Sequence, residues 1–224
     1  ALRMKKPIVI IIAGPTAVGK TAFAIALAKK LGTSILSADS RQCFRELDIG
    51  VAKPSPEELE QVPHYFINSH SVFEELTAAH YEQYALQALE TIFAGQETAV
   101  VVGGTGMYLR ALAEGLDEMP AIEDALRQSI REEYAEKGLQ WLQETVRRED
   151  PLYYESGEIE NPQRLMRALE VRRSAGRSIR HFQQGNPKER PFQLLWLGLD
   201  LPRDLLHDRI ERRVDAMLLA GLEE

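Results

Sequence analysis

The chain has 224 residues, of which 44% are hydrophobic and 27% charged, so its length and composition predict a globular protein with one large domain or a core plus an insert. A formal net charge of −7 excludes a protein coated in basic residues, and no apolar stretch approaches the ~20 residues of a membrane span. The single cysteine, Cys43, excludes a disulfide framework, so we expect a soluble, cytoplasmic protein.

The first expected element is a buried strand at Ile8–Ala13, which leads into a glycine loop and then a helix. The loop reads Gly14-Pro15-Thr16-Ala17-Val18-Gly19-Lys20-Thr21. A strand, a glycine loop, Lys-Thr and a helix in this order predict a phosphate-binding P-loop, in which backbone N–H groups surround an anion. Lys20 is placed to reach the outer phosphate oxygens, and Thr21 to ligate a Mg²⁺ that bridges them. The loop alone does not specify the phosphate compound.

Strand and helix patterns then alternate. Strands are expected at 8–13, 34–37, 64–68, 98–102 and, late in the chain, 193–199. Helices are expected at about 20–31, 77–94 and 107–113, and a loop at 44–57. This alternation predicts an α/β fold with a P-loop NTPase-like parallel sheet flanked by helices. Polar or glycine-rich segments at 14–21, 39–42 and 103–106 each follow a strand. Because ligands bind beyond the carboxyl ends of parallel strands, these segments should line one crevice.

The pattern changes in the second half of the chain, where no strand is expected from Pro120 to about Gln184. We therefore expect a P-loop core at 1–119, a helical insertion domain at 120–190, and a return to the core at 191–224. Residues 123–160 carry 11 acidic and 5 basic side chains, a net charge of −6, whereas 161–190 carry 8 basic and 2 acidic, a net charge of +6. The basic half is either a solvated helix face or a nucleic-acid-binding surface.

One helix of the insert has clear start and stop signals. Asn161 is a favourable N-cap, Pro162 suits the first helical position, and Gly176 follows the expected end near residue 175. Helical spacing puts Leu165, Ala168 and Leu169 on the packed side and Gln163, Arg164 and Arg167 on the more exposed side.

Several residues permit both a chemical and a structural interpretation. Asp39, at a strand end opposite the P-loop, is either a base or metal ligand, or a turn-capping residue. Thr105 either donates a hydrogen bond to a ligand or belongs to a plain glycine turn. Arg213, on an expected closing helix at 201–219, either reaches the phosphate crevice or only pairs with neighbouring acids.

The strand at 98–102 ends in Gly103-Gly104 and lacks the acid of a hydrolysing ATPase. This absence disfavours motor and switch NTPases. It leaves a kinase of a small metabolite or nucleotide, or a transferase whose P-loop holds a diphosphate leaving group.

Five motifs together carry a resemblance to a known family. They are Gly14–Thr21, Ser37–Gln42, Asp48–Pro54, Gly103–Tyr108 and Asn161–Glu170, in this order. They closely resemble the tRNA isopentenyltransferase (tRNA dimethylallyltransferase) family, and the similarity runs from Ile8 to the last residue. Cys43-Phe44 replaces the usual Val-Tyr, Val51 replaces a Thr, and the segment at 64–68 is looser than the family's. The family continues past Glu224, so we expect a shortened chain.

The resemblance implies a prenyltransferase that transfers a dimethylallyl group from dimethylallyl diphosphate to N6 of adenosine 37, beside the anticodon of tRNA. It implies Asp39 as proton acceptor, Lys20 and Arg213 as groups stabilising the diphosphate, and Mg²⁺ as the cofactor held by Thr21. The tRNA-binding residues expected are Asp39, Ser40, Arg41, Gln42, Thr105, Arg127, Gln163, Arg164, Leu165, Met166 and Arg167. The expected partners are the anticodon stem-loop and the diphosphate, bound by a monomer without membrane association.

Two rival functions stay open from the sequence. A P-loop kinase explains the phosphate loop and the sheet, but it does not explain the Asn161–Glu170 motif. A non-catalytic RNA-binding module explains the basic half of the insert, but it gives the complete P-loop no role.

Overall fold

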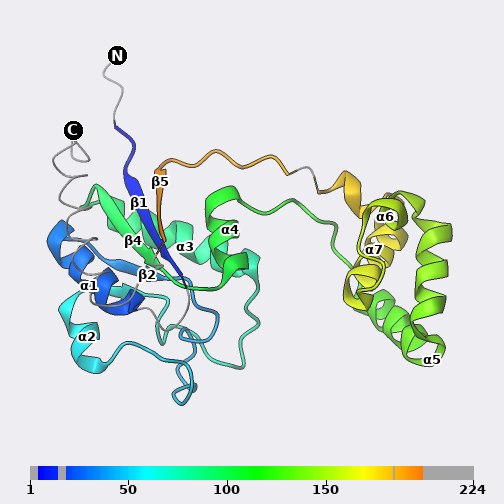
Figure 1. Ribbon diagram of the computed structural model, residues 1–224, viewed down its shortest axis with the longest axis horizontal. Helices are drawn as coiled ribbons and strands as arrows, with labels where there is room; N and C mark the ends of the chain where they lie inside the picture. Colours follow the sequence, from blue (N-terminus) through cyan, green and yellow to red (C-terminus); the bar gives the residue numbers. More distant parts are fainter. Residues whose placement is uncertain (1–4, 15–18, 184, 199–224) are drawn as a thin grey trace. The chain divides into compact units, whose positions relative to one another are not determined.

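The core of the protein is a five-stranded parallel sheet, which a computed structural model describes over residues 5–14, 19–183 and 185–198 (Figure 1). The strands are β1 (Ile8–Ala13), β2 (Ile35–Ser37), β3 (His64–Tyr65), β4 (Thr98–Val102) and β5 (Gln193–Gly198). They lie in the order β3-β2-β4-β1-β5, and every neighbouring pair is parallel. The expected parallel α/β sheet with a P-loop-like arrangement is confirmed.

Both faces of the sheet are buried under helices, as Figure 1 shows. Alternate side chains of β1 enter two separate hydrophobic clusters, because successive residues of a strand point to opposite faces. Val9 and Ile11 pack in one cluster with α3 (Ala78–Phe93) and α4 (Gly106–Glu114). Ile10 and Ile12 pack in the other with α1 (Lys20–Leu31). The unbroken apolar run of β1 is therefore what a strand buried on both faces requires.

The segment between β2 and α3 differs from the expectation. The expected loop at 44–57 is wrong at its end, because α2 (Pro56–Gln61) begins there. Ser55 Oγ accepts from Glu58 N at 3.1 Å and Glu58 Oε1 accepts from Ser55 N, a capping box that starts this short helix. The strand expected at 64–68 ends at Tyr65, because Phe66 and Asn68 have φ of 65° and 52°, which an extended strand does not allow.

The described residues form two compact units, one from within 1–115 and 187–224 and the other from within 116–186. The helical unit thus covers residues 116–186, whereas the sequence predicted an insert at 120–190. The second unit contains α5 (Asp124–Glu149), α6 (Pro151–Ser156), α7 (Pro162–Ala175) and a short 3₁₀ helix, Ile179–His181. Gly138 interrupts α5 with φ of 81°. The unit has a core of its own, built around Ile130, Leu142 and Leu165.

Helix α7 begins and ends where the sequence predicts. Asn161 Oδ1 accepts from Arg164 N at 3.3 Å, and Gly176 ends the helix with φ of 70°. We expect Asn161→Ala to lower the free energy of unfolding by about 1 kcal/mol, because it removes this cap. Chemical denaturation of the variant measures the change, with Asn161→Asp as a control that keeps a capping oxygen. Equal stability of Asn161→Ala and the wild-type protein would contradict the capping role.

No helix in the described part of the chain is long and apolar enough to cross a membrane. The closing helix expected at 201–219, with Arg213 on it, lies outside the described residues, as do Pro15, Thr16, Ala17 and Val18 of the P-loop.

Candidate functional site

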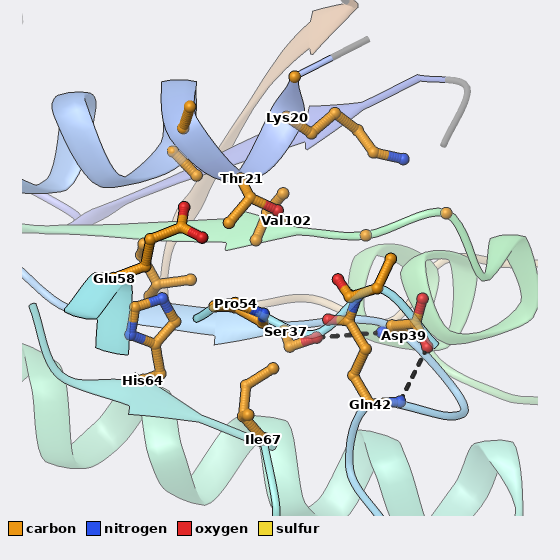
Figure 2. Close-up of a pocket in the computed structure, with 17 residues that line it drawn as sticks. Lys20, Thr21, Ser37, Asp39, Gln42, Pro54, Glu58, His64, Ile67 and Val102 are labelled. Carbon is orange, nitrogen blue, oxygen red and sulfur yellow. Dashed lines mark hydrogen bonds between the residues drawn. The ribbon is translucent and has the colours of Figure 1, made fainter. Parts of the chain in front are cut away.

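A cavity of about 250 Å³ lies at the carboxyl ends of the parallel strands, between α1 and the loops that follow β2 and β4. Its polar lining includes Lys20, Thr21, Ser37, Asp39 and Gln42, together with Gly103 and Gly104. Figure 2 shows that Lys20 and Thr21 project from α1 while Asp39 and Gln42 come from the loop after β2. Described residues from each of the three segments expected to line one crevice therefore do so.

The phosphate-loop side of the cavity is formed by the start of α1. Gly19 precedes the helix with φ of 80°, a left-handed conformation that glycine adopts without strain, and it has no side chain to cap the helix. The first N–H groups of the helix and its positive end are thus available to an anion. Thr21 lies in the first turn and lines the cavity.

Lys20 lies close to both glycine loops. Its Nζ donates a hydrogen bond to the carbonyl oxygen of Gly14. A Cβ atom added to Gly104 would lie 3.5 Å from the same Nζ, so the second glycine loop passes directly beside the lysine. Burial lowers the pKa of Lys20 from its ordinary value, and the nearby carboxylate of Asp39 acts in the opposite direction. The charges of the lysine and the aspartate therefore interact across the cavity.

Asp39 caps a turn, as one interpretation of the sequence expected, and it also lines the cavity. Its Oδ1 accepts from Arg41 N at 2.8 Å and from Gln42 N at 3.0 Å, so the carboxylate caps the turn that it starts. The same residue lines the cavity opposite Lys20. The two backbone N–H groups fix the orientation of the carboxylate, which is what a positioned proton acceptor needs.

The second glycine loop braces the Asp39 turn. Thr105 Oγ1 accepts from Ser40 N at 3.1 Å, and Thr105 N donates to Ala38 O at 3.3 Å. A Cβ atom on Gly103 would lie 2.5 Å from Ala38 C, so only glycine allows the two loops to approach this closely. The hydroxyl of Thr105 thus has a partner within the protein, besides any ligand.

Gln42 holds another loop over the cavity. Its Nε2 donates to Val51 O at 3.2 Å and to Ala52 O at 3.0 Å. Sequence reasoning did not single out the lining residues that this loop and its neighbours contribute, namely Ala52, Pro54, Glu58, His64 and Ile67. The Asp48–Pro54 motif was the one available signal, but it suggested no role for its residues.

The tRNA-binding residues expected in the helical unit divide into two groups. Gln163 and Arg164 are exposed, and the side chains of Arg127 and Arg167 are 37% and 38% exposed. The expectation that the side chains of Leu165 and Met166 contact tRNA is wrong, because they are 0% and 6% exposed and pack in the core of this unit. Helical spacing turns these two apolar side chains inward, so neither is available for direct contact with RNA.

The oxygen groups at the phosphate end fit Mg²⁺. This ion prefers hard oxygen ligands and commonly takes only one or two from the protein, with the rest from phosphate and water. Thr21 supplies a hydroxyl on the cavity wall, and Asp39 a carboxylate. Among the described residues, no group of three or more His, Cys, Asp or Glu side chains is arranged to hold a metal by itself.

Comparison with known proteins identifies the family. Residues 42–224 match the sequence model of the family described as IPP transferase. The chain belongs to the IPP transferase family. This membership confirms the family expected from the five motifs. A related IPP transferase, named tRNA dimethylallyltransferase, from Cytophaga hutchinsonii is 44% identical over 216 residues, which is 96% of this chain and 71% of that protein. One from Bacteroides thetaiotaomicron is 42% identical, over 96% of this chain and 70% of that protein.

Solved structures of IPP transferases agree with this assignment. The tRNA isopentenylpyrophosphate transferase from Bacillus halodurans is 33% identical, with a TM-score of 0.54 over 97% of this chain and 68% of that chain. A eukaryotic dimethylallyltransferase, captured acting on tRNA, is 27% identical, with a TM-score of 0.72 over 96% of this chain and 54% of that one. Family membership thus favours the transferase over the P-loop kinase.

Proposed function

We propose that this IPP transferase transfers a dimethylallyl group from dimethylallyl diphosphate to N6 of adenosine 37 in tRNA. One observation carries the proposal: Lys20 at the phosphate loop and the oriented carboxylate of Asp39 line the same cavity. Lys20 can stabilise a diphosphate leaving group, and Asp39 can accept the proton of a weakly basic amine nucleophile. The relatives' names, which specify a dimethylallyl group and tRNA, support the choice of substrates.

In this reaction negative charge develops on the diphosphate and positive charge on the allylic carbon, and the cavity has groups suited to both. The allylic C–O bond breaks, and its electron pair leaves with the diphosphate, where Lys20 and the N-terminal N–H groups of α1 stabilise the negative charge. The N6 lone pair forms the new C–N bond. Asp39 accepts the proton that the amine loses. Mg²⁺ held through Thr21, when bound, would neutralise further charge on the diphosphate. That Arg213 also stabilises the diphosphate stays a prediction.

The apolar part of the lining suits the five-carbon chain of the donor. Ala24, Ile35, Ile67 and Val102 contribute aliphatic side chains beside the polar end of the cavity. A hydrocarbon group gains stability when it leaves water for such surroundings, and excluding water protects an allylic cation from hydrolysis.

Two donors distinguish the proposal from the kinase alternative. The protein is incubated with unmodified tRNA and either dimethylallyl diphosphate or ATP, and release of diphosphate or ADP is measured. Diphosphate release that depends on tRNA supports the proposal. ADP release with ATP, and no diphosphate release with the prenyl donor, would support the kinase. The monomeric state and the cytoplasmic location stay predictions.

The exposed arginines of α7 are expected to bind tRNA phosphates. In the double variant Arg164→Ala/Arg167→Ala, we expect weaker tRNA binding and a smaller slope of log K against log salt, by just under one unit for each phosphate that an arginine no longer neutralises. Titrations at several salt concentrations measure both quantities. A solvated face that does not touch RNA predicts that affinity and slope stay unchanged. Loss of folding would instead show that these arginines act in the packing of the unit.

A further inference from the structure

Glu170 is a buried acid of α7 that contacts two arginines from different helices. Its side chain is 7% exposed. Its Oε2 accepts a hydrogen bond from Arg167 Nη1 at 3.4 Å, and the Nε of Arg127, on α5, lies 3.8 Å from the same oxygen. One carboxylate oxygen thus draws together two guanidinium groups that the chain separates by forty positions, 127 against 167.

Both arginines stay accessible although they pair with a buried acid. Their side chains are 37% and 38% exposed, whereas that of Glu170 is 7% exposed. Burying a carboxylate is unfavourable unless it is paired, and Arg167, three positions away on the same helix, already supplies a partner. The second arginine therefore adds little that the carboxylate requires. It does add a second partly exposed cation beside the first.

We propose that Glu170 is a positioning residue, which holds Arg127 and Arg167 together as a binding site for a backbone phosphate of the RNA substrate. The inference rests on the proposed function, because it assumes that tRNA is the substrate. The two guanidinium groups share one buried carboxylate, and a second carboxylate, that of the fully exposed Asp124, lies 3.8 Å from Arg127 Nη1, where water and salt screen the pair. Guanidinium groups bind phosphate oxygens through paired N–H donors, so two of them held side by side suit one phosphate. Ordering long side chains opposes binding, so arginines that are already ordered bind more tightly.

A role for Glu170 that is limited to its charge makes the opposite prediction for RNA binding. Glu170→Gln keeps the shape of the side chain but removes a negative charge, which makes the surface more positive by one unit. Electrostatics alone then predicts equal or tighter binding of RNA. The positioning role predicts weaker binding, because the two guanidinium groups lose the charge that orders them. The direction of the change separates the two roles.

The test measures tRNA affinity of the whole protein over a range of salt concentrations. We expect Glu170→Gln to bind about 5- to 20-fold more weakly than the wild-type protein, with an unchanged salt slope, since both arginines still reach the phosphate. Arg127→Ala and Arg167→Ala should each weaken binding and also flatten the slope. The matched control is Glu149→Gln. Glu149 also joins α5 to α7, through hydrogen bonds of 2.9 and 3.0 Å from Arg173, and its loss should change affinity by no more than about twofold.

Each outcome decides the proposal. Binding by Glu170→Gln as tight as, or tighter than, that of the wild-type protein overturns it, and so does unchanged binding by both arginine variants. If Glu170→Gln does not fold, Glu170→Asp takes its place. The aspartate keeps the charge but is shorter by one methylene, and we expect about 2- to 5-fold weaker binding at a wild-type melting temperature, whereas wild-type affinity overturns the proposal. A wild-type protein that does not bind tRNA contradicts the proposed function itself.

Discussion

Replacing Asp39 by asparagine is expected to slow prenyl transfer by about 10²- to 10⁴-fold, the usual contribution of a positioned general base. The amide oxygen can still accept from Arg41 N and Gln42 N, so the turn after β2 should keep its shape. What the variant lacks is a group that takes the proton from N6. Single-turnover transfer with saturating tRNA measures the effect, and tRNA affinity should change little.

Asp39→Ala is the control for the structural role of this side chain. Alanine removes the two turn-capping hydrogen bonds as well as the proton acceptor, so a loss of stability should appear in this variant and not in Asp39→Asn. A near-wild-type rate for Asp39→Asn would contradict the role of base. Asp39 would then serve only to cap the turn that carries Ser40, Arg41 and Gln42.

Replacing Lys20 by alanine is expected to have the second large effect. Removing one preorganised group that stabilises developing negative charge slows a reaction by about 10²- to 10³-fold, and Lys20 is the described cation that lines the cavity beside the phosphate loop. Rapid-quench transfer and titration with a non-hydrolysable dimethylallyl diphosphate analogue, at fixed Mg²⁺, measure rate and affinity. We expect both to fall while tRNA binding is retained.

The matched control is Lys29→Ala, which removes an exposed lysine from the last turn of the same helix. This variant should transfer at the wild-type rate. Unchanged donor affinity and rate in Lys20→Ala would exclude the phosphate loop as the donor site. Thr21→Ala should weaken donor binding mainly in the presence of Mg²⁺, because the threonine is the proposed metal ligand.

Local patterns predicted the parts of the fold that depend on local causes. The apolar run of β1, the cap at Asn161 and the stop at Gly176 each follow from neighbouring residues, and each is found where expected. Helix α2 was missed because none of its residues is buried, so it has no apolar stripe to show a helical period. Its signal was the capping box at Ser55.

Interactions between residues distant in sequence could not be predicted. Arg190 donates to Glu82 Oε1 at 2.8 Å and to the carbonyl oxygens of Ala111 and Leu112, and nothing near Arg190 in the sequence indicates these partners. The same holds at the site, where the carbonyl of Ala38 requires glycine at position 103. Leu165 and Met166 were wrongly expected to contact tRNA, because every residue of a family motif was assigned the same role. Burial differs from one side chain of the motif to the next, and these two are buried.

The proposed function requires that Lys20 and Asp39 serve one prenyl transfer to tRNA. The most direct measurement digests tRNA to nucleosides after incubation with the protein and dimethylallyl diphosphate, and locates the modified position by mass spectrometry. We predict one dimethylallyl group on N6 of adenosine 37, and its loss with Asp39→Asn, with Lys20→Ala, and with a tRNA carrying guanosine at that position. Unmodified tRNA from a folded wild-type protein that binds both substrates would contradict this claim.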